Sequence, residues 1–320
     1  MAVESAVLTI VINDPAAEDY ARLLGERFPQ VRAIAAPDPE RLERHIADAD
    51  VLLGFRFPVD VFDQAKKLRW FQCSGAGVDA LLPIRDRADH ITVTNARGLH
   101  GDIITDFVMA GVTMLHWDFP QFLRDQAERK WNARDVAPLA DRTLGIVGLG
   151  SIGTTIARRA KSAGMTVIGS KRDISVPVDG VDRLFAFDAL DDLLPLCDFV
   201  VLALPATAET VGLIGATEIA RMRRDAFLIN IARGNVVVEA DLIKALQAGA
   251  IAGALLDVFE REPLPQDSPL WGMSNVILTP HAAGNATNYR QWLFSLFVEN
   301  IERFLNGQAL KNLVDLRRGY

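Results

Sequence analysis

Three glycines between an apolar run and an amphipathic segment constrain this chain more than any other feature. Gly148, Gly150 and Gly153 match the pattern G-x-G-x-x-G. The apolar run 144–147 precedes them, and the segment 151–163, with apolar residues at helical spacing, follows. A strand, a glycine turn and a helix in this order are typical of a dinucleotide-binding βαβ unit. The first glycine allows a tight turn, the second lets the backbone approach a pyrophosphate, and the third lets the helix pack on the sheet.

The start of the helix that follows the turn predicts which atoms hold the pyrophosphate. Backbone N–H groups in the first turn of a helix have no partner within the helix, and they bind anions. We therefore expect the cofactor site to include the turn and the first helical residues, namely Gly148, Gly150, Ser151, Ile152 and Gly153.

The end of the next predicted strand, 165–169, bears on the choice between NAD and NADP. A site that selects NAD usually carries an acidic residue here, bound to the ribose 2′-OH. This chain has Ser170, Lys171 and Arg172 instead, and two cations with a hydroxyl suit a 2′-phosphate. We therefore predict that NADP(H) is preferred and that NAD(H) is the second option. The alternative is a solvated Lys–Arg pair, with Asp173 as a weak acceptor.

Short β-branched runs alternate with helical patterns along most of the chain, which is typical of parallel βαβ units in an α/β fold. Asp14-Pro15 and Asp38-Pro39 each predict a helix with an aspartate cap and a proline at its first position. The predicted strands are 7–12, 31–35, 51–54, 68–73, 91–94, 144–148, 165–169, 199–204, 226–231, 251–258 and 276–278. The other predicted helices are 103–117, 120–131, 151–163, 240–248 and 289–305.

Charge and composition exclude several classes of protein. The chain has 34 Lys and Arg against 41 Asp and Glu, a net charge of −7, whereas a nucleic-acid binder needs a concentrated basic face. No apolar run reaches the roughly 20 residues that cross a bilayer, so we expect no membrane partner. Cys73 and Cys197 lie in apolar runs and form no Cys/His cluster. We therefore expect free core thiols, no metal site and a cytoplasmic protein.

Three residues that suit hydride chemistry on a 2-oxo acid follow the last three predicted strands. They are Arg233, Glu262 and His281, and ligands of open α/β sheets bind at such strand ends. A guanidinium can hold a carboxylate, an imidazolium can protonate a carbonyl oxygen, and an acid can keep the imidazole charged. Glu260 is a second candidate for the acid. The other four histidines have no motif around them, and we interpret them as surface or packing residues: His45, His90, His100 and His116.

The chain resembles the D-isomer-specific 2-hydroxyacid dehydrogenases, especially their glyoxylate/hydroxypyruvate reductase-like branch. The resemblance covers nearly the whole chain and rests on segments 74–79, 148–153, 205–210, 230–234, 256–263, 278–284 and 300–305. It implies an α/β fold with two doubly wound parallel-sheet domains. A Rossmann cofactor domain, residues 98–285, is then inserted into a flavodoxin-like substrate domain, residues 1–97 and 286–320. It also implies a homodimer, formed through the segment before Trp131.

The resemblance implies an NAD(P)-dependent oxidoreductase. Such an enzyme reduces a small 2-oxo acid, such as glyoxylate or hydroxypyruvate, to the D-2-hydroxy acid by hydride transfer from NAD(P)H. In this family Arg233 would bind and polarise the substrate, and His281 would be the acid/base. Glu262, which stands directly before Pro263 as the family places it, would be the partner of His281.

The same resemblance implies further binding residues. The backbone N–H groups of Ala76 and Gly77 would bind the substrate carboxylate. Arg56 is a further candidate for the substrate, with a plain surface role equally open. Asp257 would lie near the nicotinamide carboxamide. The remaining implied cofactor residues are Leu204, Pro205, Ala232 and Gly284.

Two alternative functions stay open. A dinucleotide-sensing, corepressor-like interaction protein of the same family would keep the site residues, and a turnover assay separates it from an enzyme. A phosphite or formate dehydrogenase would share the fold. The formate enzymes typically carry Gln where Glu262 stands, which disfavours formate, and phosphite is less cleanly excluded. The sequence also leaves open which 2-oxo acid is the physiological substrate.

Overall fold

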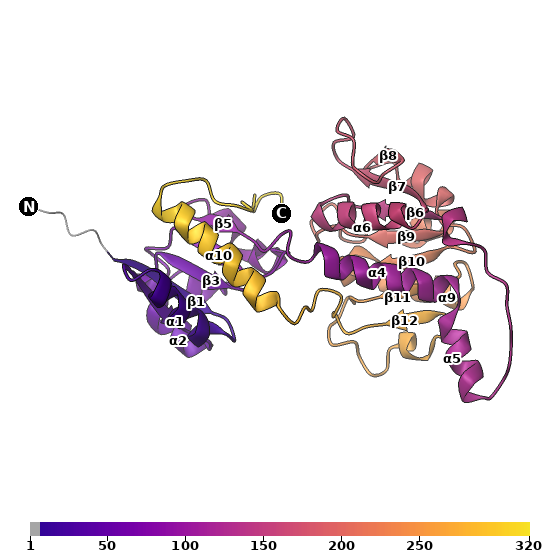
Figure 1. Cartoon of the computed structure of the whole chain (residues 1–320), viewed down its shortest axis with the longest axis horizontal. Helices are drawn as coiled ribbons and strands as arrows, with labels where there is room; N and C mark the ends of the chain where they lie inside the picture. The colour runs from indigo at the N-terminus through magenta and orange to yellow at the C-terminus, as the bar shows by residue number, and fades with distance from the viewer. Residues whose placement is uncertain (1–6) are drawn as a thin grey trace, which may run out of the picture. The chain divides into compact units, whose positions relative to one another are not determined.

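The computed structural model describes residues 7–320 of the chain. They divide into two compact units (Figure 1): residues up to Leu99 together with Ala286–Tyr320, and His100–Asn285. Each unit contains one parallel sheet. The α/β class and the two parallel sheets that the sequence predicts are confirmed.

The smaller unit has five strands in the order β2-β1-β3-β4-β5, the strand order of flavodoxin-like folds. Ile10 and Ile12 enter one apolar core, whereas Val11 enters the other, because successive side chains of a strand point to opposite faces. Helices α1 and α10 cover the first face, and α2 and α3 cover the second. The bounds are β1 Leu8–Asn13, β2 Val31–Ala35, β3 Val51–Gly54, β4 Trp70–Cys73, β5 Thr92–Thr94, α1 Ala17–Arg27, α2 Pro39–His45, α3 Val59–Phe62 and α10 Tyr289–Leu305.

The larger unit has seven strands in the order β12-β11-β10-β9-β6-β7-β8. Counted from its own first strand, this is the Rossmann order 3-2-1-4-5-6 with one added strand. The strands are β6 Thr143–Val147, β7 Thr166–Lys171, β8 Arg183–Ala186, β9 Phe199–Leu202, β10 Phe227–Asn230, β11 Gly253–Leu256 and β12 Val276–Leu278.

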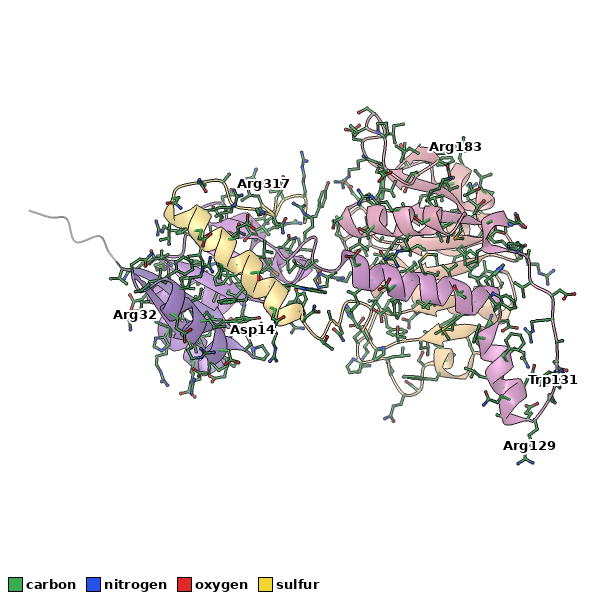
Figure 2. The ribbon with its side chains drawn as sticks, in the orientation of Figure 1. Asp14, Arg32, Arg129, Trp131, Arg183 and Arg317 are labelled. Atoms are coloured by element: carbon green, nitrogen blue, oxygen red, sulfur yellow. The ribbon has the colours of Figure 1, made fainter. Side chains whose placement is uncertain are left out.

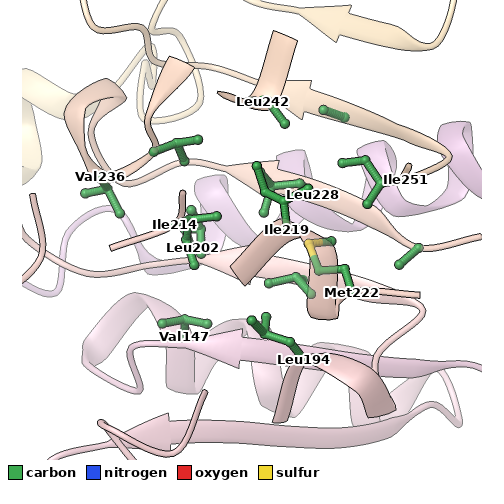
Figure 3. Packing of buried hydrophobic residues seen from close by; sticks show 14 of the residues in the cluster. Val147, Leu194, Leu202, Ile214, Ile219, Met222, Leu228, Val236, Leu242 and Ile251 are labelled. Carbon is green, nitrogen blue, oxygen red and sulfur yellow. The ribbon is translucent and has the colours of Figure 1, made fainter. Parts of the chain in front are cut away.

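Helices cover both faces of the larger sheet. On one face, α4 and α6 lie side by side (Figure 1) and contribute to one core. On the other face, the region of α7, α8 and α9 contributes to a second core, in which Figure 3 shows Ile219, Leu228 and Leu242. The helices are α4 Gly101–His116, α5 Phe119–Ala127, α6 Ser151–Ser162, α7 Leu190–Leu193, α8 Ala216–Arg221 and α9 Glu239–Gln247.

Helix α1 corrects one sequence prediction. The helix starts at Ala17, with Ala16 as its N-cap residue, and Pro15 is not its first helical position. Asp14 instead forms a turn before the helix, because its carboxylate accepts a hydrogen bond from the Ala16 N–H at 2.9 Å. At α2 the prediction is confirmed, since the Asp38 carboxylate accepts from the backbone N–H two residues beyond Pro39 at 2.9 Å.

Two further observations concern the cysteines and the apolar helices. Cys73 and Cys197 are both buried, as the sequence predicts, and neither forms a disulfide bond among residues 7–320. In the part of the chain that the structure describes, no helix has both the length and the apolar character that a membrane span requires.

The glycine turn after β6 holds α6 against the sheet. A Cβ placed on Gly153 would lie 2.1 Å from the carbonyl oxygen of Gly148, whereas a Cβ on Gly150 would meet nothing within 4 Å. Gly153 therefore serves packing within the chain, and Gly150 leaves open space.

This difference predicts that alanine destabilises the protein at position 153 and not at position 150. Gly153→Ala overpacks the contact between helix and turn, so we expect the free energy of unfolding to fall by about 1–3 kcal/mol. Gly150→Ala, the matched control, changes it by no more than about 0.5 kcal/mol. Urea denaturation followed by circular dichroism measures both. Equal denaturation midpoints for the two variants would contradict the packing role of Gly153.

Candidate active site

The loops that follow β10, β11 and β12 leave the larger sheet at one edge. Asn230 pairs with Leu256, and Leu256 pairs with Leu278, at the last residue of each strand. Since the three strands are parallel and adjacent, the three loops begin side by side at their carboxyl ends. This is the edge of an open α/β sheet at which ligands bind.

The first loop carries Arg233. The buried Asn230 side chain fixes its turn: its oxygen accepts from the Ala232 N–H at 3.1 Å, and its nitrogen donates to the Arg233 carbonyl at 3.1 Å. The Arg233 guanidinium donates through Nη1 to the Ala232 carbonyl at 2.7 Å. A Cβ on Gly234 would lie 1.8 Å from the carbonyl carbon of Phe259. The Arg233 loop therefore packs directly on the backbone of the second loop.

The second and third loops bring Glu262 to His281. Nδ1 of His281 lies 2.8 Å from Oε2 of Glu262, and both side chains are partly exposed. The other Glu262 oxygen accepts from the Phe259 N–H at 3.1 Å, which fixes the carboxylate. Glu260 instead exchanges hydrogen bonds with the backbone and carboxylate of Glu239. Because Nδ1 faces the carboxylate, Nε2 is the nitrogen of His281 that remains for proton transfer.

Asp257 fixes the loop that carries His281. Its side chain is 2% exposed. Oδ1 accepts from the Thr279 hydroxyl at 2.6 Å and the Ala282 N–H at 2.8 Å, and Oδ2 accepts from the Ala283 N–H at 3.0 Å. Its carbonyl accepts from the His281 N–H at 2.8 Å, which supports the left-handed backbone of that residue (φ 50°). Sequence reasoning missed these contacts, because only the fold brings them together.

The turn after β6 fits a pyrophosphate. Gly148 adopts a φ of 101°, which glycine reaches without steric cost. The N-cap residue Gly150 provides no side-chain cap for α6, so backbone N–H groups at Ser151, Ile152 and Gly153 are offered to an anion. Leu204 adjoins the turn, since a Cβ on Gly148 would lie 2.9 Å from its Cβ. The loop containing Pro205 therefore begins beside the phosphate turn.

The three residues predicted to select NADP, at the end of β7, differ in how exposed they are. Ser170 is fully buried, and its hydroxyl has no hydrogen-bond partner among residues 7–320. Lys171 is half-buried, with Nζ 3.5 Å from the Val176 carbonyl. Arg172 is exposed and forms an ion pair with Glu209. The two cations are therefore the accessible groups at this strand end.

Asp173 is engaged within its own loop. Its carboxylate accepts from the hydroxyl and the backbone N–H of Ser175, at 2.5 and 3.0 Å. These hydrogen bonds lower the pKa of Asp173. The carboxylate thus serves the turn after β7, which weighs against Asp173 as the ribose acceptor of an NAD site.

In the smaller unit, the predicted anion-binding loop follows β4. The Gly75 carbonyl accepts from the Ala96 N–H at 2.9 Å, and the Ala76 carbonyl accepts from the Asn95 side chain at 2.7 Å. Neither Ala76 nor Gly77 uses its N–H in a hydrogen bond with another described residue. These two donors are therefore available to an anion. Arg56 is exposed in the loop after β3.

His100, which the sequence predicts to be a surface or packing residue, is partly buried. Its ring lies against Gly284, three residues beyond His281. Burial and the Arg233 guanidinium lower the pKa of the His100 imidazole. No motif signals this position, because its neighbours in space lie more than 130 residues away in the chain.

Known proteins of one family are similar to this chain. A family model described as the D-isomer specific 2-hydroxyacid dehydrogenase, NAD binding domain, matches residues 109–283, within the larger unit. The chain is 36% identical over 296 residues to a glyoxylate reductase of Korarchaeum cryptofilum, covering 88% of this chain and 87% of that protein. It is 32% identical over 318 residues to a D-3-phosphoglycerate dehydrogenase of Methanocaldococcus jannaschii. That match covers 97% of this chain but 60% of the relative, so the chain spans less than two thirds of its length.

A solved structure extends the similarity to both units. The NADPH-dependent glyoxylate/hydroxypyruvate reductase of Sinorhizobium meliloti, in complex with NADP and sulfate, has a TM-score of 0.88 at 30% identity. The similarity covers 98% of this chain and 100% of that chain. The chain therefore belongs to the D-isomer specific 2-hydroxyacid dehydrogenase family and is an NAD(P)-dependent 2-hydroxyacid dehydrogenase, which confirms the prediction from its motifs.

Proposed function

We propose that this protein reduces a small 2-oxo acid of the glyoxylate or hydroxypyruvate type to the D-2-hydroxy acid, with NADPH as the preferred reductant. The observation that carries the proposal is the 2.8 Å contact between His281 and Glu262. The loop that carries Glu262 packs against the loop that carries Arg233. The names of the glyoxylate reductase relatives support this substrate class.

In the larger unit, the Arg233 guanidinium binds the substrate carboxylate and polarises the carbonyl. His281 donates the proton from Nε2 to the carbonyl oxygen, and the Glu262 carboxylate at Nδ1 stabilises the imidazolium. When bound, the reduced nicotinamide supplies the hydride that the carbonyl carbon gains. In the smaller unit, the N–H groups of Ala76 and Gly77 are the proposed carboxylate ligands.

The proposed cofactor site lies in the larger unit. The backbone N–H groups at the start of α6 would hold the pyrophosphate. Lys171 and Arg172 would hold the 2′-phosphate, and Arg172 would then leave its ion pair with Glu209. Because Ser170 is fully buried, the two cations carry this interaction. The other proposed cofactor residues are Leu204, Pro205, Ala232, Asp257 and Gly284.

A turnover assay with a panel of small 2-oxo acids tests the function. We expect NADPH consumption with glyoxylate or hydroxypyruvate, and a loss of roughly 10²–10⁴ in kcat for His281→Ala, because general acid catalysis is removed. Glu262→Gln also lowers kcat, since it removes the charge beside the imidazole.

Glu260→Gln is the matched control for this assay. Glu260 contacts Glu239 and not His281, so its loss leaves kcat near the wild-type value. A wild-type protein without reductase activity would favour the corepressor-like alternative. Turnover of phosphite would favour the phosphite dehydrogenase alternative. Wild-type kcat/KM in His281→Ala would refute the acid/base assignment.

Cofactor preference is tested at the end of β7. For the double variant Lys171→Ala/Arg172→Ala we expect the KM for NADPH to rise roughly tenfold or more, because charge-assisted hydrogen bonds to the phosphate are lost. The KM for NADH stays within about twofold, since NADH lacks that phosphate. Lys161→Ala, which removes an exposed cation paired with Asp182, is the control. A wild-type KM for NADH at or below that for NADPH would overturn the preference.

We also propose a homodimer formed through the ends of α4 and α5 and the segment that follows α5. Four large apolar side chains there are exposed: Trp117, Phe119, Leu123 and Trp131. Trp131 is 97% exposed, and Figure 2 shows it on the segment after α5. Exposed apolar patches of this kind mark interaction surfaces.

Light scattering coupled to size exclusion tests this interface. We expect the mass of two chains for the wild-type protein and a shift toward one chain for Leu123→Asp/Trp131→Ala, since a charge in an apolar interface is costly. Trp271→Ala removes an exposed tryptophan elsewhere and leaves the mass unchanged. A wild-type monomer at micromolar concentration would contradict the proposal.

A further inference from the structure

Two successive carbonyl groups of the predicted anion-binding loop are hydrogen-bonded to the segment that follows β5. The Gly75 carbonyl accepts from the Ala96 N–H at 2.9 Å. The Ala76 carbonyl accepts from Nδ2 of Asn95 at 2.7 Å. Both carbonyls therefore point toward residues 95 and 96.

These two hydrogen bonds also fix the direction of the N–H groups that are proposed as carboxylate ligands. In a planar trans peptide unit, the C=O of one residue and the N–H of the next point in opposite directions. The Gly75 carbonyl shares its unit with the Ala76 N–H, and the Ala76 carbonyl shares its unit with the Gly77 N–H. Both N–H groups are therefore turned away from residues 95 and 96, in a loop whose residues 75–77 are partly exposed.

The peptide unit between Ala76 and Gly77 needs an outside contact to keep this direction. Turning the unit over changes mainly ψ of Ala76 and φ of Gly77. Glycine adopts positive and negative φ about equally well, so the backbone itself opposes this rotation only weakly. A turned unit would present a carbonyl oxygen to the substrate carboxylate in place of an N–H group. The hydrogen bond from Asn95 opposes the rotation, because the rotation would leave the Asn95 amide without its acceptor.

Asn95 is suited to hold this carbonyl because it is itself fixed. The residue is 2% exposed. Its Oδ1 accepts from the Arg97 N–H at 3.2 Å, which leaves Nδ2 as the donor toward Ala76. Its backbone N–H donates to the Asn312 carbonyl at 3.2 Å, and its carbonyl accepts from the Asn312 side chain at 3.2 Å. The segment after α10 therefore holds the residue that orients the loop.

We propose that Asn95 is a positioning residue for the substrate, which keeps the Gly77 N–H directed at the substrate carboxylate through its hydrogen bond to the Ala76 carbonyl. This inference rests on the proposed 2-oxo acid reductase function and adds to it the group that orients a carboxylate ligand. Asn95 contributes no atom to hydride or proton transfer. Its loss therefore weakens substrate binding and leaves the chemical step nearly unchanged.

The test replaces Asn95 with leucine, which has a similar shape but neither a donor nor a charge. Three sets of quantities are measured: the KM and kcat for glyoxylate or hydroxypyruvate, the Kd of oxamate in the NADPH-saturated protein by calorimetry, and the Kd of NADPH by fluorescence. For Asn95→Leu we expect the KM and the oxamate Kd to rise roughly tenfold to hundredfold, because a hydrogen bond to a charged group is lost. The kcat and the NADPH Kd stay within about threefold.

Asn13→Leu is the matched control. At the end of β1, Nδ2 of Asn13 donates to the Ala36 carbonyl at 2.7 Å. The control therefore removes a hydrogen bond of the same kind and length from the same sheet, away from the anion-binding loop. We expect the KM, the kcat and both Kd values of Asn13→Leu to stay within about twofold of the wild type.

Each other outcome overturns the inference. A wild-type oxamate Kd in Asn95→Leu shows that the loop keeps its direction without Asn95, and an equal rise in Asn13→Leu shows a general loosening of the sheet. A lower kcat at unchanged KM, or a raised NADPH Kd, places the effect outside carboxylate binding. If Asn95→Leu fails to fold, Asn95→Ala replaces it, and failure of both variants to fold assigns Asn95 to structure alone.

Failure of the proposed function gives a different result. A wild-type protein that binds oxamate but turns over no 2-oxo acid refutes the reductase function, and the oxamate Kd of the variants still decides on Asn95. Absence of oxamate binding to the wild type overturns the inference as well.

Discussion

A buried carboxylate at the end of β11 sets the geometry of the candidate site. Asp257 accepts three hydrogen bonds from the loop that carries His281, and its own segment leads to Glu262. Both members of the 2.8 Å pair are therefore held by chain segments that meet at one buried group. Without this carboxylate, buried donors would lose their partner, at a cost of about 1–3 kcal/mol each. The loop conformation thus depends on a residue that need not take part in proton transfer.

The chain has a net charge of −7, yet its proposed ligands are anions. The proposed anion ligands are therefore mostly local hydrogen-bond donors: the backbone N–H groups at the N-terminus of α6 and those of Ala76 and Gly77. Only a few side-chain cations are added, Arg233 in one loop and Lys171 with Arg172 at the end of β7. Backbone donors suit this purpose, because they bind an anion without adding charged side chains.

Most of the fold, and the residues proposed for the site, can be predicted from the sequence because both follow from local patterns. The glycine turn and the three loops after β10, β11 and β12 each begin at an apolar run, so strand ends and site residues were predicted together. Strand β8, Arg183–Ala186, was not predicted, because a short edge strand lacks a long apolar run. Helix α1 starts later than predicted, because the Asp14 side chain is used in a preceding turn.

Residues whose surroundings come from distant segments could not be predicted in this way. Ser170 is buried because helices cover both faces of the larger sheet, and residues 167–170 of β7 are all buried. The alternation of side chains along the strand therefore gives no signal for its burial. The contacts of Asp257 and the position of His100 beside Gly284 depend on tertiary packing alone. They appear only when the loops are placed at one sheet edge.

The most direct measurement is a crystal structure of the protein with NADP and oxamate bound. The predicted result has the Arg233 guanidinium on the oxamate carboxylate, Nε2 of His281 within hydrogen-bond distance of the oxo oxygen, and the nicotinamide C4 facing the carbon that corresponds to the substrate carbonyl. The contrary result has oxamate bound away from Arg233, or His281 turned from the oxo oxygen while it remains paired with Glu262. Either of these would remove the basis for the proposed hydride and proton transfer.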